Sequence, residues 1–137
     1  MRMIGLIGGM SWESTATYYK LINEGIRAAR GDLASASLLL HSLDFSRVVA
    51  LQKADDWQGA AQLLGKAARG LSRAGAERIL ICTNTMHLVA QEVERAAQVP
   101  LIDIISETAG ALKAAQRKRT LLLGTRYTME HGFYAQR

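Results

Sequence analysis

Residues 78–87, Arg-Ile-Leu-Ile-Cys-Thr-Asn-Thr-Met-His, place an apolar run directly before a group of small polar side chains. This pattern predicts a buried strand over 78–82, a turn at 83–85 and a helix that continues to about Ala97. A strand that leads into a helix, with no hairpin signal between them, is typical of a parallel sheet with helical crossovers.

The same alternation of short apolar runs and segments with helical periodicity extends in both directions from this point. Ser11 and Ser106 are expected to cap helices, and the strand at 37–43 is apolar enough to be covered on both faces. Further strands are expected at 3–7, 101–105 and 120–123, and further helices at 12–30, within 44–57, at 60–74, from Ser106, and at 127–136. The sequence therefore predicts an α/β fold, a parallel sheet with helices on both faces in three layers.

Composition narrows the possible functions of these 137 residues. With 49% hydrophobic and 21% charged residues, the chain is neither disordered nor rich in charge, and no apolar run approaches the ~20 residues of a membrane span. One cysteine rules out an intramolecular disulfide and favours a cytoplasmic location. The cations behind the net charge of +5 are scattered, several of them in last helical turns, so nucleic acid is not expected as a partner.

Three loops fall at the carboxyl ends of predicted strands, where open α/β sheets bind ligands. They comprise residues 8–11, 82–85 and 124–125, and each leads into a helix N-terminus. Such loops are either ordinary turns and caps or, where three converge, a site for a carboxylate or phosphate. The Gly patterns of dinucleotide and P-loop sites and the Gly-x-Ser-x-Gly of hydrolases are absent, and the cysteine and three histidines have no metal-ligand spacing.

The loop after residue 81 carries the most reactive side chains. Because side chains alternate along a strand, Cys82 and Thr83 should point in opposite directions, and Cys82 is expected to be a buried small apolar residue. His87 is expected to be an ordinary residue of the first helical turn.

Three segments together resemble the aspartate/glutamate racemase superfamily, and most closely its broad-specificity amino-acid racemase branch. They are Ile-Gly-Leu-Ile-Gly-Gly-Met-Ser-Trp-Glu-Ser-Thr at 4–15, Cys-Thr-Asn-Thr-Met-His at 82–87, and Leu-Gly-Thr-Arg-Tyr-Thr-Met at 123–129. The resemblance implies inversion of the α-carbon of a free amino acid by two-base proton transfer, without PLP or any other cofactor. It also implies two similar α/β domains, an active site between them, and a homodimer.

The resemblance also implies roles for particular residues. Thr83 stands where most relatives have a catalytic cysteine, and in this branch the threonine is the expected proton donor on its face of the substrate. Substrate-binding residues are expected to be Met10, Ser11, Gln52, Thr83, Asn84 and Thr85.

The sequence also differs from these relatives in the second of the two catalytic residues. Relatives supply a second catalytic cysteine from a C-terminal Gly-Cys-Thr-Glu loop, which this sequence lacks. Residues 1–115 are therefore expected to form an N-terminal domain, and 116–137 the first strand and helix of a truncated second domain. Two alternatives remain open, a non-catalytic module that binds amino acids or small carboxylates and, less favoured, a nucleotide-binding domain.

Overall fold

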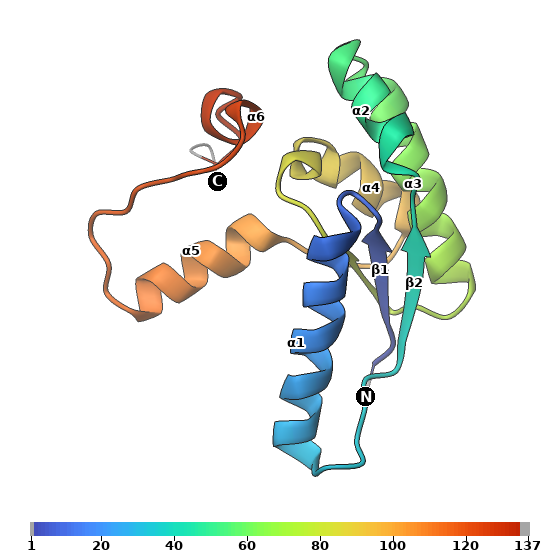
Figure 1. Cartoon of the computed structure of the whole chain (residues 1–137), viewed down its shortest axis with the longest axis vertical. Helices are drawn as coiled ribbons and strands as arrows, with labels where there is room; N and C mark the ends of the chain where they lie inside the picture. Colours follow the sequence, from blue (N-terminus) through green and yellow to red (C-terminus); the bar gives the residue numbers. More distant parts are fainter. Residues whose placement is uncertain (1, 135–137) are drawn as a thin grey trace.

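The computed structural model describes residues 2–134 and shows a four-stranded parallel sheet in the order β2-β1-β3-β4 (Figure 1). The strands are β1 (Ile4–Gly8), β2 (Leu38–Ser42), β3 (Arg78–Ile81) and β4 (Leu101–Ile102). The helices are α1 (Trp12–Arg30), α2 (Phe45–Lys53), α3 (Trp57–Arg73), the short 3-10 helix η1 (Thr85–Val89), α4 (Ala90–Ala97), α5 (Ile104–Ala114) and α6 (Arg126–Glu130). The predicted α/β class is confirmed, and within the described residues none of the helices is both long and apolar enough to cross a bilayer.

Helices cover both faces of the sheet, as the sequence predicts. Ile7 on β1 packs into one core cluster with Leu64 and Ala67 of α3. A side chain at Gly8 would point the other way and meet Thr15 of α1. Figure 1 shows α1 and α3 on opposite sides of the sheet, so the sheet is the central layer of a three-layer arrangement.

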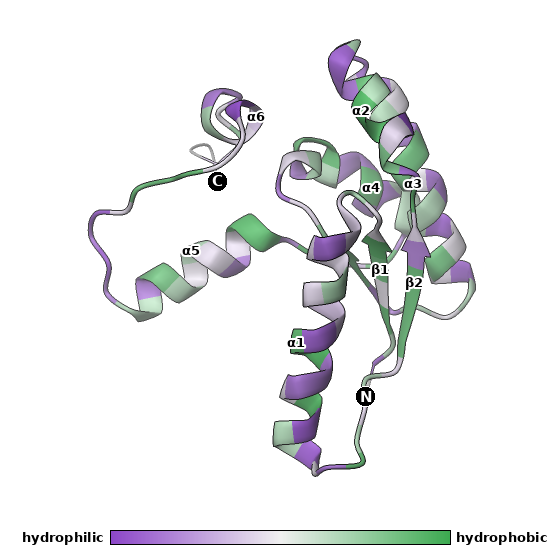
Figure 2. Cartoon of the chain, in the orientation of Figure 1, coloured by the Kyte–Doolittle hydropathy of each residue, from purple (hydrophilic) through white to green (hydrophobic). Residues whose placement is uncertain are grey.

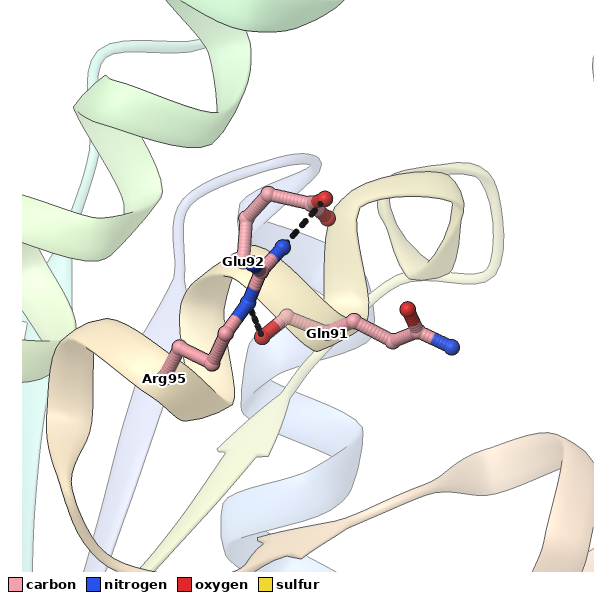
Figure 3. Close-up of polar contacts among 3 residues, drawn as sticks. All are labelled: Gln91, Glu92 and Arg95. Atoms are coloured by element: carbon pink, nitrogen blue, oxygen red, sulfur yellow. Dashed lines mark hydrogen bonds and ion pairs between the residues drawn. The ribbon is translucent and has the colours of Figure 1, made fainter.

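The hydropathy of each element matches its position, with hydrophobic residues in the sheet and mixed residues on the helices that cover it. In Figure 2, β1 is mostly hydrophobic, whereas α1 alternates between hydrophobic and hydrophilic residues along its length. The charged side chains of α4 lie on its outer surface, where Arg95 bonds the Glu92 carboxylate at 2.9 Å and the Gln91 carbonyl at 3.4 Å (Figure 3). An exposed pair of this kind contributes only about 0.3–0.5 kcal/mol, so the buried apolar face determines where α4 packs.

The prediction that the second strand is covered on both faces is wrong. Among the described residues β2 pairs only with β1 and forms the edge of the sheet. Leu40 is 47% exposed, and His41 and Ser42 are exposed as well. An apolar run alone does not distinguish an edge strand from a central one, because that depends on which segments pair with it.

The fifth strand is also absent from the structure. Residues 120–123 have no regular secondary structure and pair with no other described segment, and Leu121 and Leu123 are 82% and 76% exposed. Figure 1 shows α5 projecting from the body of the domain, with this segment beyond it. A strand needs a partner for its backbone groups, and the described chain offers none at this position.

The capping of two helices differs from the predictions. The strand β4 ends at Ile102 because Asp103, not Ser106, caps α5 and accepts hydrogen bonds from the backbone N–H groups of Ile105 and Ser106. Ser11 occupies the N-cap of α1, but its side chain does not bond the helix. The helix predicted over 127–136 is shorter, Arg126–Glu130, and its predicted end lies outside the described residues.

Glycine is required where β1 leaves the sheet. Gly9 has a φ of +84°, and a Cβ there would collide with the backbone of Leu43. We expect Gly9→Ala to lower the free energy of unfolding by about 1–3 kcal/mol, because rigid backbone cannot move aside. The matched control is Gly25→Ala on the exposed side of α1, where the space is open and a gain of about 0.5–1 kcal/mol is expected. Urea denaturation measures both, and equal stabilities would contradict this account of the turn.

Candidate functional site

The loops after β1 and β3 lie side by side because the two strands are parallel neighbours. The backbone N–H of Cys82 continues the ladder to the Ile7 carbonyl at 2.9 Å. One turn into α1, the Ser14 hydroxyl donates to the Cys82 carbonyl at 3.0 Å. The N–H of Gly9 donates to the Thr15 hydroxyl at 2.9 Å. These bonds fix the start of α1 against the loop that follows β3.

A cavity of about 340 Å³ lies at this edge of the sheet. It is lined by Met10, Ser11, Ser14, Tyr18, Thr83, Asn84, Thr85, Gly124, Thr125 and Thr128. All three loops that the sequence predicts to converge therefore contribute to one cavity. A larger cavity of about 750 Å³ between α5 and residues 117–122 shares none of these residues.

Five of the six predicted substrate-binding residues line this cavity, and Gln52 does not. The Gln52 side chain donates to the Met86 sulfur at 3.2 Å, and its backbone carbonyl accepts from the Tyr127 hydroxyl at 3.4 Å. Gln52 therefore connects α2, η1 and α6 in this structure, and its contact with substrate stays a prediction.

Sequence reasoning missed three lining residues, Ser14, Tyr18 and Thr128. Ser14 and Tyr18 follow Ser11 at steps of three and four residues on α1, which places all three on one face of the helix. That spacing was a usable signal once Ser11 had been assigned to the site. Thr128 carried no comparable signal, since its position depends on how α6 folds back over the loop after β3.

Threonine hydroxyls connect the third loop to the second. The Thr125 hydroxyl lies 3.2 Å from the Thr85 hydroxyl and 3.2 Å from that of Thr128. On the other side of the loop, the Tyr134 hydroxyl donates to the Asn84 carbonyl oxygen. With its oxygen occupied in this way, the Asn84 amide has its N–H donors available for another acceptor.

Cys82 is separated from the cavity, as strand alternation predicts. It has no exposed surface and does not line the cavity, whereas Thr83 does. Burial raises the pKa of the Cys82 thiol to about 12, because a thiolate would lose its hydration there. Cys82 is therefore a neutral packing residue in this fold.

His87 is more than a residue of a first helical turn, because it is 1% exposed and bonded through both ring nitrogens. Nδ1 lies 2.8 Å from the Thr83 carbonyl oxygen, and Nε2 accepts from the Ile104 N–H at 3.3 Å. These partners match the neutral ring with its proton on Nδ1. The imidazole thereby connects the loop after β3 to the start of α5.

The cavity lining holds no Asp, Glu, His, Lys or Arg side chain. Arg47 of α2 is exposed and does not line the cavity. Among residues 2–134 there is also no group of three or more His, Cys, Asp or Glu side chains that could hold a metal ion. What the lining offers a ligand is a set of neutral hydroxyl and amide donors.

A family model described as Asp/Glu/Hydantoin racemase matches residues 7–137. The chain belongs to this racemase family. The resemblance read from the three loop segments is thus confirmed, and those segments are the ones that meet at the cavity.

Individual members of the racemase family give the same result. The chain is 25% identical over 135 residues to the broad specificity amino-acid racemase RacX of Bacillus subtilis (strain 168), covering 96% of this chain and 58% of RacX. A crystal structure of a candidate Asp/Glu racemase from Yersinia pestis matches with 53% identity and a TM-score of 0.94, over 98% of this chain and 58% of that one. An aspartate racemase homologue from Pyrococcus horikoshii OT3 matches with 36% identity and a TM-score of 0.83, over 99% of this chain and 59% of that one. This chain therefore spans somewhat more than half the length of these racemases.

The buried thiol gives a direct test of the geometry behind Thr83. A pKa of about 12 leaves only about one thiolate in 10⁴ at pH 8, so native Cys82 should react with a thiol reagent at least a hundredfold more slowly than in urea. The native rate should also keep rising between pH 8 and 10. Because Cys82 is the only cysteine, a colorimetric thiol assay reports on it alone. Rapid labelling of the native protein would place Cys82 in the cavity instead of behind it.

Proposed function

We propose that this chain provides one side of the active site of an amino-acid racemase that inverts the α-carbon by proton transfer, without PLP or another cofactor. The observation that supports this most directly is that Met10, Ser11, Thr83, Asn84 and Thr85 line one cavity at the carboxyl edge of the sheet. Family membership supplies the reaction class, and the lining supplies what that reaction needs on one face of a substrate.

In such a reaction the α-proton leaves on one face while another group delivers a proton on the opposite face. Negative charge then moves into the substrate carboxylate, which fixed hydrogen-bond donors stabilise. We assign this task to the N–H and O–H groups around Asn84, Thr85 and Ser11. The Thr83 hydroxyl, which has no hydrogen-bond partner among the described residues, is the proposed proton donor on its face.

The second base is proposed to come from a part of the racemase beyond this lining. None of the ten lining residues has a carboxylate, imidazole or thiol side chain. A threonine hydroxyl is a poor base for a carbon acid, because its pKa lies far above that of a thiol at ~8.5. The residues of this chain can therefore hold a substrate and deliver a proton more readily than remove one.

This same absence of a strong base favours one alternative, a module that binds amino acids or small carboxylates without catalysis. The two proposals differ in what happens to the α-proton of a bound ligand. In a racemase half-site a base from the solvent slowly removes the α-proton, the fixed donors stabilise the resulting carbanion, and the Thr83 hydroxyl returns a solvent-exchanged proton. In a binding module the α-proton stays in place.

Proton NMR in D₂O separates the two. With L-glutamate, L-aspartate or L-homoserine, we expect saturable binding and slow α-deuterium incorporation, at most about 10²-fold above the rate in buffer. Thr83→Val, which keeps the shape and removes the hydroxyl, should return exchange to the buffer rate. Binding with no exchange would favour the binding module. Rapid racemisation would show that this chain holds a complete two-base site and would contradict the half-site mechanism.

We also propose a cytoplasmic homodimer that uses the segment after α5. Leu121 and Leu123 are exposed apolar side chains on a segment that pairs with no described strand, and both features favour association. Residues 116–137 are proposed, as the sequence suggests, to be the first part of a second domain.

Sedimentation equilibrium tests the role of this segment. The double variant Leu121→Lys with Leu123→Lys should shift the chain from dimer to monomer, because lysine solvates the segment and opposes edge-to-edge pairing. Leu33→Lys is the matched control, since Leu33 is fully exposed in the turn between α1 and β2 and should leave the mass unchanged. A wild-type chain that stays monomeric at high concentration would contradict the proposal.

A further inference from the structure

An anionic ligand in this cavity would meet neutral donors only. The lining has no lysine, arginine or histidine, so a carboxylate must be held by hydroxyl, amide and backbone N–H groups. Each such bond to a charged acceptor is stronger than its neutral counterpart, and the site depends on how many protons point into it. The binding of a carboxylate therefore depends on which hydroxyl protons are not already used in hydrogen bonds within the protein.

Several hydroxyls of the lining are already used within the protein. Ser14 donates to the Cys82 carbonyl, and the Thr125 hydroxyl lies within hydrogen-bond distance of the hydroxyls of Thr85 and Thr128, two contacts that use two of the three threonine protons. Among the described residues, no hydrogen bond involves the side-chain hydroxyl of Ser11, Tyr18 or Thr83. All three residues line the cavity, and each of these hydroxyls has a proton to give.

Tyr18 differs from the other two in chemistry and in position. A phenol is the more acidic hydroxyl and hence the stronger donor, with an ordinary pKa near 10. Tyr18 lies two turns into α1, the helix that Ser14 fixes against the loop after β3. Its ring is half-buried, so its orientation is restricted before a ligand arrives.

The phenol also keeps its proton at neutral pH. Burial raises the pKa of Tyr18, and the nearby Cys82 and Tyr134 raise it further by a smaller amount. A raised pKa means that the neutral form, the one that can donate, is favoured in the fold.

We propose that the Tyr18 hydroxyl donates a hydrogen bond to the α-carboxylate of the bound amino acid, an inference that rests on the proposed function of the cavity. Tyr18 then acts together with Asn84 and the backbone of the loop after β3, all of which belong to the lining of the same cavity. No bond is made or broken by Tyr18, which is a binding residue and not the proton donor assigned to Thr83.

The experiment compares two ligands that differ only at the α-carboxylate. L-Glutamate carries the carboxylate, and L-isoglutamine replaces it with a neutral amide while keeping the side-chain carboxylate. Tyr18→Phe, which removes only the hydroxyl, should raise the Kd for L-glutamate about tenfold and change that for L-isoglutamine less than about twofold. NMR titration of the full chain measures both constants, and the urea midpoint reports whether the variant is folded.

Tyr19→Phe is the matched control, because Tyr19 is the next residue of α1, is 52% exposed and does not line the cavity. It should leave both Kd values unchanged. If Tyr18→Phe binds L-glutamate as tightly as wild type, or weakens both ligands equally, the assignment of Tyr18 to the α-carboxylate is overturned while the proposed function stands. If the wild-type chain binds neither L-glutamate nor the other amino acids tested, the proposed function and this inference both fail.

Discussion

The parallel pairing of β1 with β3 is the constraint on which the site depends. Ile7 pairs with Ile81, so the two strands end at the same edge of the sheet, and the next backbone bond, from Cys82 to Ile7, extends the ladder into the loop. A shift of one residue would turn Thr83 away from the cavity and bring Cys82 into it, because side chains alternate along the chain. The identity of the group that faces the ligand is thus set by register as much as by sequence.

Buried polar contacts keep that loop in place. His87 bonds the Thr83 carbonyl and the Ile104 N–H from a site with almost no exposed surface. In such surroundings an unpaired carbonyl or N–H costs about 1–3 kcal/mol. The two hydrogen bonds therefore fix the imidazole, and the imidazole in turn fixes the position of the loop after β3. This explains why an imidazole stands two residues after Thr85 without taking part in the lining itself: it supports the segment from behind.

How much the sequence predicts depends on how local the deciding interactions are. The strands and helices from Ile4 to Ala97, and the meeting of the loops after β1 and β3, follow from hydrophobic periodicity and from the rule that parallel strands end at one edge. The third loop reaches the same cavity although the strand predicted before it is not part of the sheet. The edge position of β2, the unpaired segment 120–123 and the capping of α5 by Asp103 do not, because each depends on which groups are neighbours in space. Tyr18 combines the two cases. Its helical spacing from Ser11 could be read from the sequence, but only the hydrogen bonds of the structure show that its hydroxyl is not bonded to another described residue.

Thr83 stands where the family resemblance implies a cysteine in most relatives, and an alcohol at this position changes what this face of the cavity can do. A thiol titrates within reach of neutral pH and can both take and give a proton, whereas an alcohol remains protonated. The only thiol of the chain lies one position earlier, where burial raises its pKa to about 12 and removes it from proton transfer. With Thr83 and the Tyr18 phenol both protonated at neutral pH, the role proposed for this face is to stabilise negative charge on a substrate through hydrogen bonds. The step that creates that charge then requires a stronger base on the opposite face of the α-carbon.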